Sequence, residues 1–169
     1  MELIEEWYRQ YGLDVFNYLV YRMGTRDVDD LVQETFIRAL QGVHHFSGDA
    51  SPKTWLISIA RNVANGFYRK KHRSISSEPL FDMESTERPI EKLIDSMDAK
   101  RVIERGLGTM RRSYVDVVIL RGVMDLSVSE AAEALGWSES KVRVTWHRAL
   151  KKLRVFLEGE GTWDVSIRE

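Results

Sequence analysis

The chain has 169 residues, a net charge of −1 and a hydrophobic fraction of 43%, enough for one large domain or two small ones with real cores. It contains no cysteine, which excludes disulfides, thiolate catalysis and cysteine-ligated zinc. Glu2, Glu5 and Glu6 open the chain in place of the basic and then apolar order of a signal peptide, and no apolar run approaches the roughly 20 residues of a membrane span. We therefore expect a cytoplasmic protein.

Charge is distributed unevenly along the chain. Residues 61–73 carry five Lys and Arg with no Asp or Glu, and residues 138–154 carry six against one, so each segment has a net charge of +5. Residues 74–99, between them, have a net charge of −5. A single site for a polyanion would need only one cationic stretch, so the two basic segments predict two separate contacts with nucleic acid.

The first 73 residues are expected to form three helices. Apolar residues follow helical spacing over residues 3–23. Asp27 is a candidate N-cap for a second helix, whose buried stripe lies within residues 28–40. A polar loop over residues 42–52 precedes a third helix, which starts at Lys53 or Thr54 and runs towards residue 73. The outer face of the second helix carries Asp29, Asp30, Gln33, Glu34 and Arg38.

The end of the third helix mixes cations with Asn amides and aromatic rings. Residues 61–73 read Arg-Asn-Val-Ala-Asn-Gly-Phe-Tyr-Arg-Lys-Lys-His-Arg. Charges can follow a DNA backbone, rings can stack on exposed bases and Asn can hydrogen-bond a base edge, so this combination suits DNA whose strands are being separated. For Trp55 and Phe67 individually, a place in the core explains the residue equally well.

A second helical domain is expected after a linker. Residues 74–88 are rich in Ser, Glu, Asp and Pro, which is typical of a linker. Helical periodicity resumes over residues 89–107, and Ser113 with Asp116 is expected to begin a further helix. The predicted fold is all-α, with two small helical domains joined by a flexible linker. The expected limits are residues 1–73, linker 74–88, residues 89–158 and a tail of 159–169.

The segment from Leu126 to Arg154 predicts a helix-turn-helix. Ser127 and Glu130 form a capping box for a first helix, which Gly136 ends. Ser138 can cap a second helix, whose inward stripe contains Val142, Trp146, Ala149, Leu150 and Leu153. The opposite face has the basic, short and forked side chains that a helix in a DNA major groove needs: Ser140, Lys141, Arg143, Val144, His147, Arg148 and Lys151. A helical hairpin with a solvated basic face is the alternative.

Four motifs follow one another along the chain: Asp30-Leu31-Val32-Gln33-Glu34-Thr35-Phe36, Phe46 with Thr54-Trp55-Leu56, Ile59-Ala60-Arg61-Asn62 before the basic run, and residues 138–154. Their order resembles that of the extracytoplasmic-function (ECF) sigma factors of bacterial RNA polymerase, over nearly the whole chain. Lys53-Thr54-Trp55-Leu56 and the Ser-Glu-Ser-Lys-Val of residues 138–142 are most similar to the SigX type of bacilli. The resemblance implies a promoter-specificity subunit, not an enzyme, that serves envelope-stress genes and needs no cofactor.

The resemblance also implies roles for individual residues. Asp30, Gln33 and Glu34 match positions that dock on the clamp helices of the polymerase beta-prime subunit. Asn62 and the loop over residues 46–53 match positions that capture a flipped base of the −10 element. The implied −10 contacts are Asn62, Arg61, Arg69, Lys70, Lys71 and Arg73. The implied −35 contacts are Ser140, Lys141, Arg143, Val144, His147, Arg148 and Lys151, of which Arg143, Val144 and His147 match base-reading positions.

The implied partners are core RNA polymerase, through its beta-prime clamp and beta subunit, promoter DNA and an anti-sigma factor. Anti-sigma factors of this class are usually membrane-bound, so the protein is expected to be held at the membrane without entering it. A relaxed linker of the 15 residues 74–88 averages roughly 20 Å, whereas the two promoter elements lie about two helical turns apart, each roughly 34 Å. The polymerase is therefore expected to set the separation of the two domains.

Three departures from the common family pattern cover five positions. Gly66 replaces Asp, Met110-Arg111 replaces Leu-Pro, and Ser140-Lys141 replaces Gly-Thr. The last change adds a cation at the start of the recognition helix, so the −35 sequence of other members is not assumed. Gly66 lowers helix propensity by roughly 1 kcal/mol and is expected to loosen the helix beyond Asn62.

Other functions explain less of the sequence. Asp30 and Glu34 lie one helical turn apart, but a carboxylate-bridged metal site would also need Glu-x-x-His pairs, and His44-His45 has no further ligand at zinc spacing. No phosphate-binding loop or nucleophile motif is present. The main alternative, a stand-alone helix-turn-helix regulator, leaves residues 61–73 and the acidic face without a function, and a helical adaptor explains neither basic segment. A regulator should bind duplex DNA alone, usually as a dimer, whereas a sigma factor should bind promoters well only with core polymerase.

Overall fold

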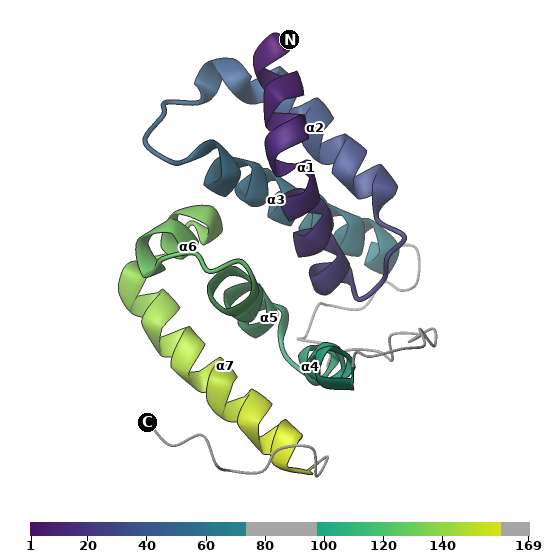
Figure 1. Cartoon of the computed structure of the whole chain (residues 1–169), viewed down its shortest axis with the longest axis vertical. Helices are drawn as coiled ribbons and strands as arrows, with labels where there is room; N and C mark the ends of the chain where they lie inside the picture. The colour runs from purple at the N-terminus through teal and green to yellow at the C-terminus, as the bar shows by residue number, and fades with distance from the viewer. Residues whose placement is uncertain (74–97, 160–169) are drawn as a thin grey trace.

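The computed structural model describes residues 1–73 and 98–159, and both of these described stretches are helical and contain no strand (Figure 1). The predicted all-α class is confirmed. The expected linker, residues 74–88, the predicted helical turns over residues 89–97 and the tail from residue 160 lie outside the described residues. In chain order the elements are α1 (Glu2–Met23), α2 (Asp29–Gly42), the 3-10 turn η1 (Val43–His45), α3 (Pro52–Arg73), α4 (Asp98–Gly108), α5 (Arg112–Val118), the π-helical turn η2 (Ile119–Val123), α6 (Val128–Leu135) and α7 (Glu139–Gly159).

Helices α1, α2 and α3 pack on one another around an apolar core. Helix α1 runs without interruption through Gly12 and ends at Gly24, whose φ of 69° is a left-handed C-cap. Two residues expected in the buried stripes are exposed: Leu3 by 46% and Leu40 by 43%. Their neighbours along each helix face inward instead. The core of this unit includes Ile4, Trp7, Val15, Leu19, Val32, Phe36, Leu56, Ile57 and Ala60.

The starts of α2 and α3 differ from expectation. Asp27 does not cap α2: it is exposed, Val28 occupies the N-cap position and no side chain caps the helix. The Asp27 N–H instead donates to Thr25 Oγ1 at 3.2 Å, which uses these residues in a local turn. Helix α3 begins at Pro52, slightly earlier than expected, because Ser51 Oγ accepts a hydrogen bond from the backbone N–H of Thr54.

Helices α4, α5 and α6 pack against the long helix α7. The capping box of Ser127 and Glu130 is present, Gly136 ends α6 with a φ of 67°, and Ser138 Oγ accepts from the N–H of Lys141 at the start of α7. These predictions are confirmed. Leu150 is 40% exposed, so its assignment to the buried stripe was wrong. Leu157, about two helical turns further on, is buried.

The two helical units are in direct contact. Helix α6 packs on α3, while α5 and η2 lie against α1 (Figure 1). The helix expected to begin at Ser113 with Asp116 is present as α5, but it begins at Arg112, with Arg111 at the N-cap position and no side chain capping it. Asp116 lies inside the helix and is 1% exposed, buried at the contact between the units.

Candidate polymerase and promoter interfaces

The outer face of α2 is acidic and open. Asp30 and Gln33 are exposed, and Glu34 is half-buried. Glu34 Oε1 accepts a hydrogen bond from Arg38 Nε at 2.6 Å, and the two residues, one helical turn apart, form an exposed ion pair. Such a pair is solvated on both sides, so the carboxylate can exchange Arg38 for a cation on another protein at little cost.

The basic segment of α3 presents two kinds of cation. Asn62, Arg69, Lys70, Lys71 and Arg73 are exposed along the helix. Arg61 is less open, with a side chain 21% exposed, and its Nε donates to Asp116 Oδ2 at 3.1 Å. Five of the six residues expected to contact the −10 element are therefore exposed. The sixth, Arg61, forms an ion pair with Asp116 of the other helical unit.

The aromatic residues of this region divide between core and surface. Trp55 is partly buried and its ring contacts those of Phe46 and Trp7, with centroids 5.3 and 5.9 Å apart. A core position therefore explains Trp55. Phe67 is 45% exposed and does not belong to the core, so it remains available for stacking on a base.

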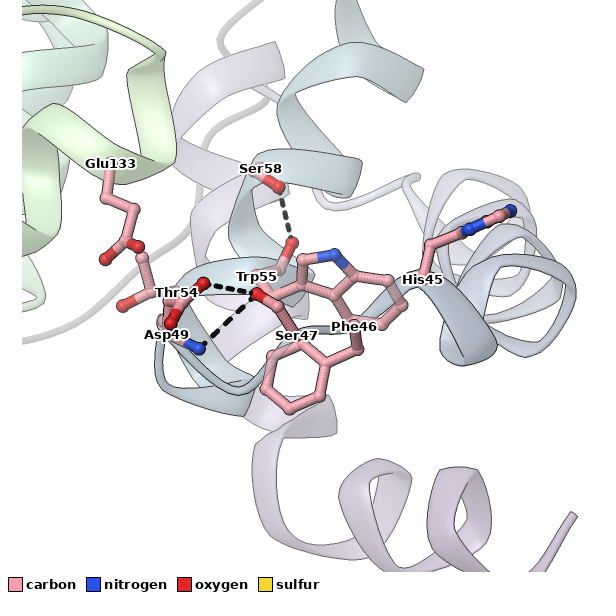
Figure 2. Close-up of a pocket in the computed structure, with 9 residues that line it drawn as sticks. His45, Phe46, Ser47, Asp49, Thr54, Trp55, Ser58 and Glu133 are labelled. Atoms are coloured by element: carbon pink, nitrogen blue, oxygen red, sulfur yellow. Dashed lines mark hydrogen bonds between the residues drawn. The ribbon is translucent and has the colours of Figure 1, made fainter.

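A hollow opens between the loop after η1 and the first turns of α3 (Figure 2). Phe46 and Trp55 form its apolar wall, while Ser47 Oγ donates to Asp49 Oδ2 at 2.7 Å at the polar side. This loop matches the one that, by the family resemblance, is expected to capture a flipped base. Glu133 completes the lining, and it comes from α6 of the other helical unit (Figure 2).

The outer face of α7 is open along its whole basic stripe. All seven residues of the expected −35 set are exposed, and Val144 is 49% exposed. Two of them contact neighbours on the same element: Arg143 Nη2 donates to Glu139 Oε2 at 3.0 Å, and Lys141 Nζ lies 4.2 Å from the centroid of the Trp137 ring. A base edge can compete for both side chains, because each pairing is solvated.

Two of the departures from the family pattern fit the helices without distortion. Helix α3 continues through Gly66, so the expected loosening does not interrupt the helix, and a Cβ there would meet no atom within 4 Å beyond its chain neighbours and its own helix backbone. Met110 is buried as a Leu would be, and the φ of −60° at Arg111 is one that a proline also adopts.

A buried polar cluster at the contact between the units was missed by the sequence reasoning. Asp116 Oδ1 accepts from Tyr18 Oη at 2.8 Å and from Arg22 Nε at 2.7 Å, and Arg22 Nη2 donates to Asn65 Oδ1 at 3.0 Å. Burial, and then the charge of Asp116, raise the pKa of Tyr18 well above its ordinary value. Burial by itself lowers the pKa of Arg22, but the charge of Asp116, the two nearby tyrosines Tyr18 and Tyr68 and the hydrogen bond to Asp116 together outweigh burial, and the pKa is raised.

A signal for this cluster was present in the sequence. Asp116 interrupts the apolar run of residues 115–120, and Arg22 lies between Tyr21 and Met23 near the end of an apolar stripe. A charge on an apolar face is expected to have a buried partner of opposite sign. The pairing itself could not be read from the sequence, since the two residues are 94 positions apart.

Within residues 1–73 and 98–159, no group of three or more His, Cys, Asp or Glu side chains is placed to hold a metal ion. No helix in the same part of the chain is long and apolar enough to cross a membrane.

The fold and the sequence together define the class. Residues 7–74 match the model of sigma-70 region 2, and residues 100–153 match that of sigma-70 region 4. The fold resembles that of the sigma factor RpoE from Bartonella quintana, solved with the anti-sigma factor NepR, with a TM-score of 0.75 and 21% identity over 94% of this chain and 98% of that one. It also resembles CnrH, solved with the cytosolic domain of CnrY, with a TM-score of 0.66 and 23% identity over 92% and 88% of the two chains.

Similar proteins narrow the class of sigma factor further. The chain is 37% identical to the ECF RNA polymerase sigma factor SigX of Bacillus subtilis (strain 168), over 93% of this chain and 84% of that protein. It is 35% identical to the RNA polymerase sigma factor YlaC of the same organism, over 89% and 90%. The chain belongs to the ECF sigma factor family, and it acts in transcription initiation by directing RNA polymerase to promoters. The resemblance stated from the sequence motifs is confirmed.

Proposed function

We propose that residues 1–73 are the unit that docks on core polymerase and opens the −10 element, and that residues 89–158 are the unit that reads the −35 element. Asp30, Gln33 and Glu34 make the docking contact with the beta-prime clamp. Charge complementarity supports this assignment, because the exposed face of α2 is acidic whereas the DNA-facing surfaces on α3 and α7 are basic.

The observation that carries the proposal is the separation of the three surfaces. The acidic face of α2, the basic face of α3 and the basic face of α7 lie on different helices, and each is exposed. One protein can therefore bind polymerase and two DNA segments at the same time. A stand-alone regulator would use only the last of these surfaces.

In the proposed −10 site, Asn62 bonds a flipped base beside the hollow of Figure 2, while Arg61, Arg69, Lys70, Lys71 and Arg73 hold the backbone. On α7, Arg143, Val144 and His147 read base edges. Arg148 and Lys151 contact phosphates on either side, and Ser140 and Lys141 contact the DNA at the start of the helix, where its N–H groups favour a phosphate.

We propose an anti-sigma factor as a further partner, and through it a location in the cytoplasm beside the membrane. The similar folds of RpoE and CnrH were solved with the anti-sigma factor NepR and with the cytosolic domain of CnrY, respectively, which supports a partner of this kind. We place the regulated genes in the response to envelope stress, on the family resemblance.

Reconstitution with core polymerase tests the proposal. Run-off transcription from fragmented genomic DNA of the source organism, followed by sequencing of the transcripts, should give a small set of start sites that depends on adding this protein to core. The protein alone should bind none of the corresponding promoters tightly. Tight binding to duplex promoters without polymerase, as a dimer, would instead support a stand-alone regulator.

A further inference from the structure

The start of helix α7 holds one acidic side chain on an otherwise basic segment. Residues 138–154 contain six Lys and Arg and a single acid, Glu139, which is the first residue of the helix. The same segment is proposed to read base edges in the major groove, between two rows of phosphates. A carboxylate there is repelled by the DNA backbone unless it meets a hydrogen-bond donor. Attraction to DNA therefore does not explain Glu139.

Local stability gives only a weak reason for this acid. Glu139 forms an ion pair with Arg143, and the two side chains are 48% and 60% exposed, so the pair adds little to stability. Capping of the helix is already provided by Ser138, whose Oγ accepts a hydrogen bond from the N–H of Lys141 at 3.2 Å. An acid in the first turn also suits the helix dipole, but any position of that turn would serve. What distinguishes position 139 is its contact with Arg143.

The carboxylate of Glu139 lies beside the part of α7 that is proposed to read bases. Its Oε2 accepts a hydrogen bond from Arg143 Nη2 at 3.0 Å, and Arg143 is assigned to a base edge. Residues four apart are separated by about 40° around a helix and by about 6 Å along it. Because base pairs stack about 3.4 Å apart, the carboxylate and the guanidinium can reach base pairs one or two steps from each other.

The turn before α7 fixes the position of Glu139. The Trp137 N–H donates to the carbonyl oxygen of Ala132 at 2.9 Å across the turn. The Val142 N–H donates to the carbonyl oxygen of Ser138 at 3.1 Å, so the first turn of α7 is already hydrogen-bonded. The N-terminal residues of a recognition helix are the ones that contact base edges. Glu139 is thus held on a rigid element, at the end of the helix that approaches the bases.

We propose that Glu139 is a further specificity-determining residue, which accepts a hydrogen bond from an exocyclic amine in the major groove of the −35 element, either cytosine N4 or adenine N6. The inference rests on the proposed function of α7. In the free protein, Glu139 and Arg143 are each other's partners. On the right sequence both exchange that partner for a base: Arg143 donates to acceptors such as guanine O6 and N7, and Glu139 accepts from the amine.

The same pair lowers the affinity for wrong sequences. Where guanine O6 or thymine O4 faces Glu139, the carboxylate meets another acceptor and is repelled. Where no acceptor faces Arg143, the guanidinium gains nothing by leaving the carboxylate. Only a sequence that supplies both a donor and an acceptor fully replaces the ion pair, so Glu139 increases specificity by weakening binding elsewhere.

A promoter library tests this role in the complete holoenzyme. The promoters found by run-off transcription are randomised over the −35 element, and the affinity for each sequence is measured with wild type, Glu139→Gln and Glu139→Ala. Both variants should bind the average sequence more tightly, because one negative charge is removed. Both should also lose about fivefold or more of the preference for an amine-bearing base, within two steps of the base pair affected by Arg143→Ala. Gln loses this preference because its amide both donates and accepts.

Glu158→Gln is the matched control for net charge. Glu158 is exposed at the other end of α7, and its replacement removes the same charge. It should leave every base preference unchanged. A change in preference as large as that of Glu139→Gln would overturn the role of Glu139, because charge alone would then explain the effect.

A base analogue separates direct reading from a structural effect. At the preferred position, cytosine is replaced by 2-pyrimidinone, which lacks only the N4 amine, or adenine by purine, which lacks only the N6 amine. The analogue should weaken binding of the wild type about fivefold or more and that of Glu139→Ala hardly at all, since the variant has no acceptor to lose. The missing Watson–Crick hydrogen bond affects both proteins equally. Equal losses in the two proteins would overturn the contact.

Two further outcomes distinguish this role from the proposed function. Unchanged base preferences in both Glu139 variants, while the wild type shows preferences in the −35 element, would overturn the role of Glu139 and leave the proposed function intact. A wild-type holoenzyme without any base preference in the −35 element would contradict the proposed function itself, and the role of Glu139 with it.

Discussion

Asp116 and Arg22 are 94 positions apart in the sequence and form a buried ion pair, with 2.7 Å between Oδ1 and Nε. The pair joins two units that the sequence predicts as separate domains, because Arg22 lies in the last turn of the first helix of one unit and Asp116 lies inside a helix of the other. Tyr18 and Arg61 add their donors to the same carboxylate. One carboxylate thus holds donors from both α1 and α3 at a contact from which water is largely excluded, so loss of any of these partners leaves a buried polar group unsatisfied.

Charge reversal on α2 should abolish binding to core polymerase. Asp30→Lys with Glu34→Lys sets like charges against the basic clamp, and the fold should survive because both side chains face outward. Only an exposed ion pair with Arg38 is lost, worth less than about 1 kcal/mol. Affinity for core, measured by labelled-protein titration, should fall at least about a hundredfold, as expected when charged pairs become repulsive.

The control for that experiment is Glu6→Lys with Asp27→Lys, which changes the net charge equally at two exposed positions off this face. It should bind core as the wild type does. Equal losses in the two double variants would mean that net charge, not the α2 face, governs the interaction.

Asn62→Ala should weaken opening of the −10 element. Asn62 is exposed on α3, so truncation leaves the core untouched. Flipping a base costs a few kcal/mol, which specific contacts to its edge must offset. Permanganate footprinting of holoenzyme should show reduced reactivity on duplex promoters and nearly wild-type reactivity on pre-melted templates. An equal loss on both templates would point to a fold defect.

Much of the fold could be predicted because its signals are local. The capping box of Ser127 and Glu130, the Gly136 turn and the exposed stripe of α7 depend on residues within a few positions of one another. The same local rules failed at Asp27, whose side chain does not cap α2 and whose backbone N–H bonds Thr25, and at Asp116, whose carboxylate bonds side chains of the other unit. For Asp116 the competing partners are on α1 and α3, and a long-range contact leaves no periodicity in the sequence. The exposed surfaces of the site were predictable, since exposure follows helical spacing. The ion pair between Arg61 and Asp116 was not.

The stability of the protein should fall at alkaline pH through Tyr18. Its pKa is raised in the folded state, by burial first and then by the Asp116 charge, so above the unfolded value of 10.0 the folded state holds a proton that the unfolded state has lost. The stabilisation is complete below pH 10 and is lost as the pH rises above it, by at most about 1.4 kcal/mol per pH unit for one group.

Tyr18→Phe isolates this contribution. At neutral pH it removes one buried hydrogen bond to Asp116 and should lower the free energy of unfolding by about 1 kcal/mol. Above pH 10 the difference from the wild type should shrink, because the variant lacks the group that titrates. Urea unfolding at pH 8, 10 and 11 measures both effects, and parallel pH curves for the two proteins would contradict the assignment.

Gly136→Ala and Gly66→Ala should change stability in opposite directions. At both positions an added Cβ would meet no atom within 4 Å beyond its chain neighbours and its own helix backbone, so only the backbone conformation decides. Gly136 has a φ of 67°, where alanine costs about 1 to 2 kcal/mol, whereas Gly66 lies inside α3, where alanine gains about 1 kcal/mol. Thermal unfolding should give a lower Tm for the first variant and a higher one for the second. Equal shifts would mean that neither backbone argument holds.

Arg143 and Lys151 should separate base reading from phosphate attraction on one helix face. Both are exposed on α7, and Arg143 must leave Glu139 to reach DNA. If Arg143 bonds a base edge, Arg143→Ala should cost about 1 to 3 kcal/mol and relax the preference at one position of the −35 element. Lys151→Ala should weaken binding to every promoter by the same factor. It should also reduce the slope of log K against the logarithm of the salt concentration by roughly one unit. Binding of each holoenzyme to a promoter library at two salt concentrations distinguishes these outcomes. If both variants lose affinity equally on every sequence, the face is an electrostatic platform, and discrimination must come from Val144, His147 or the first helical unit.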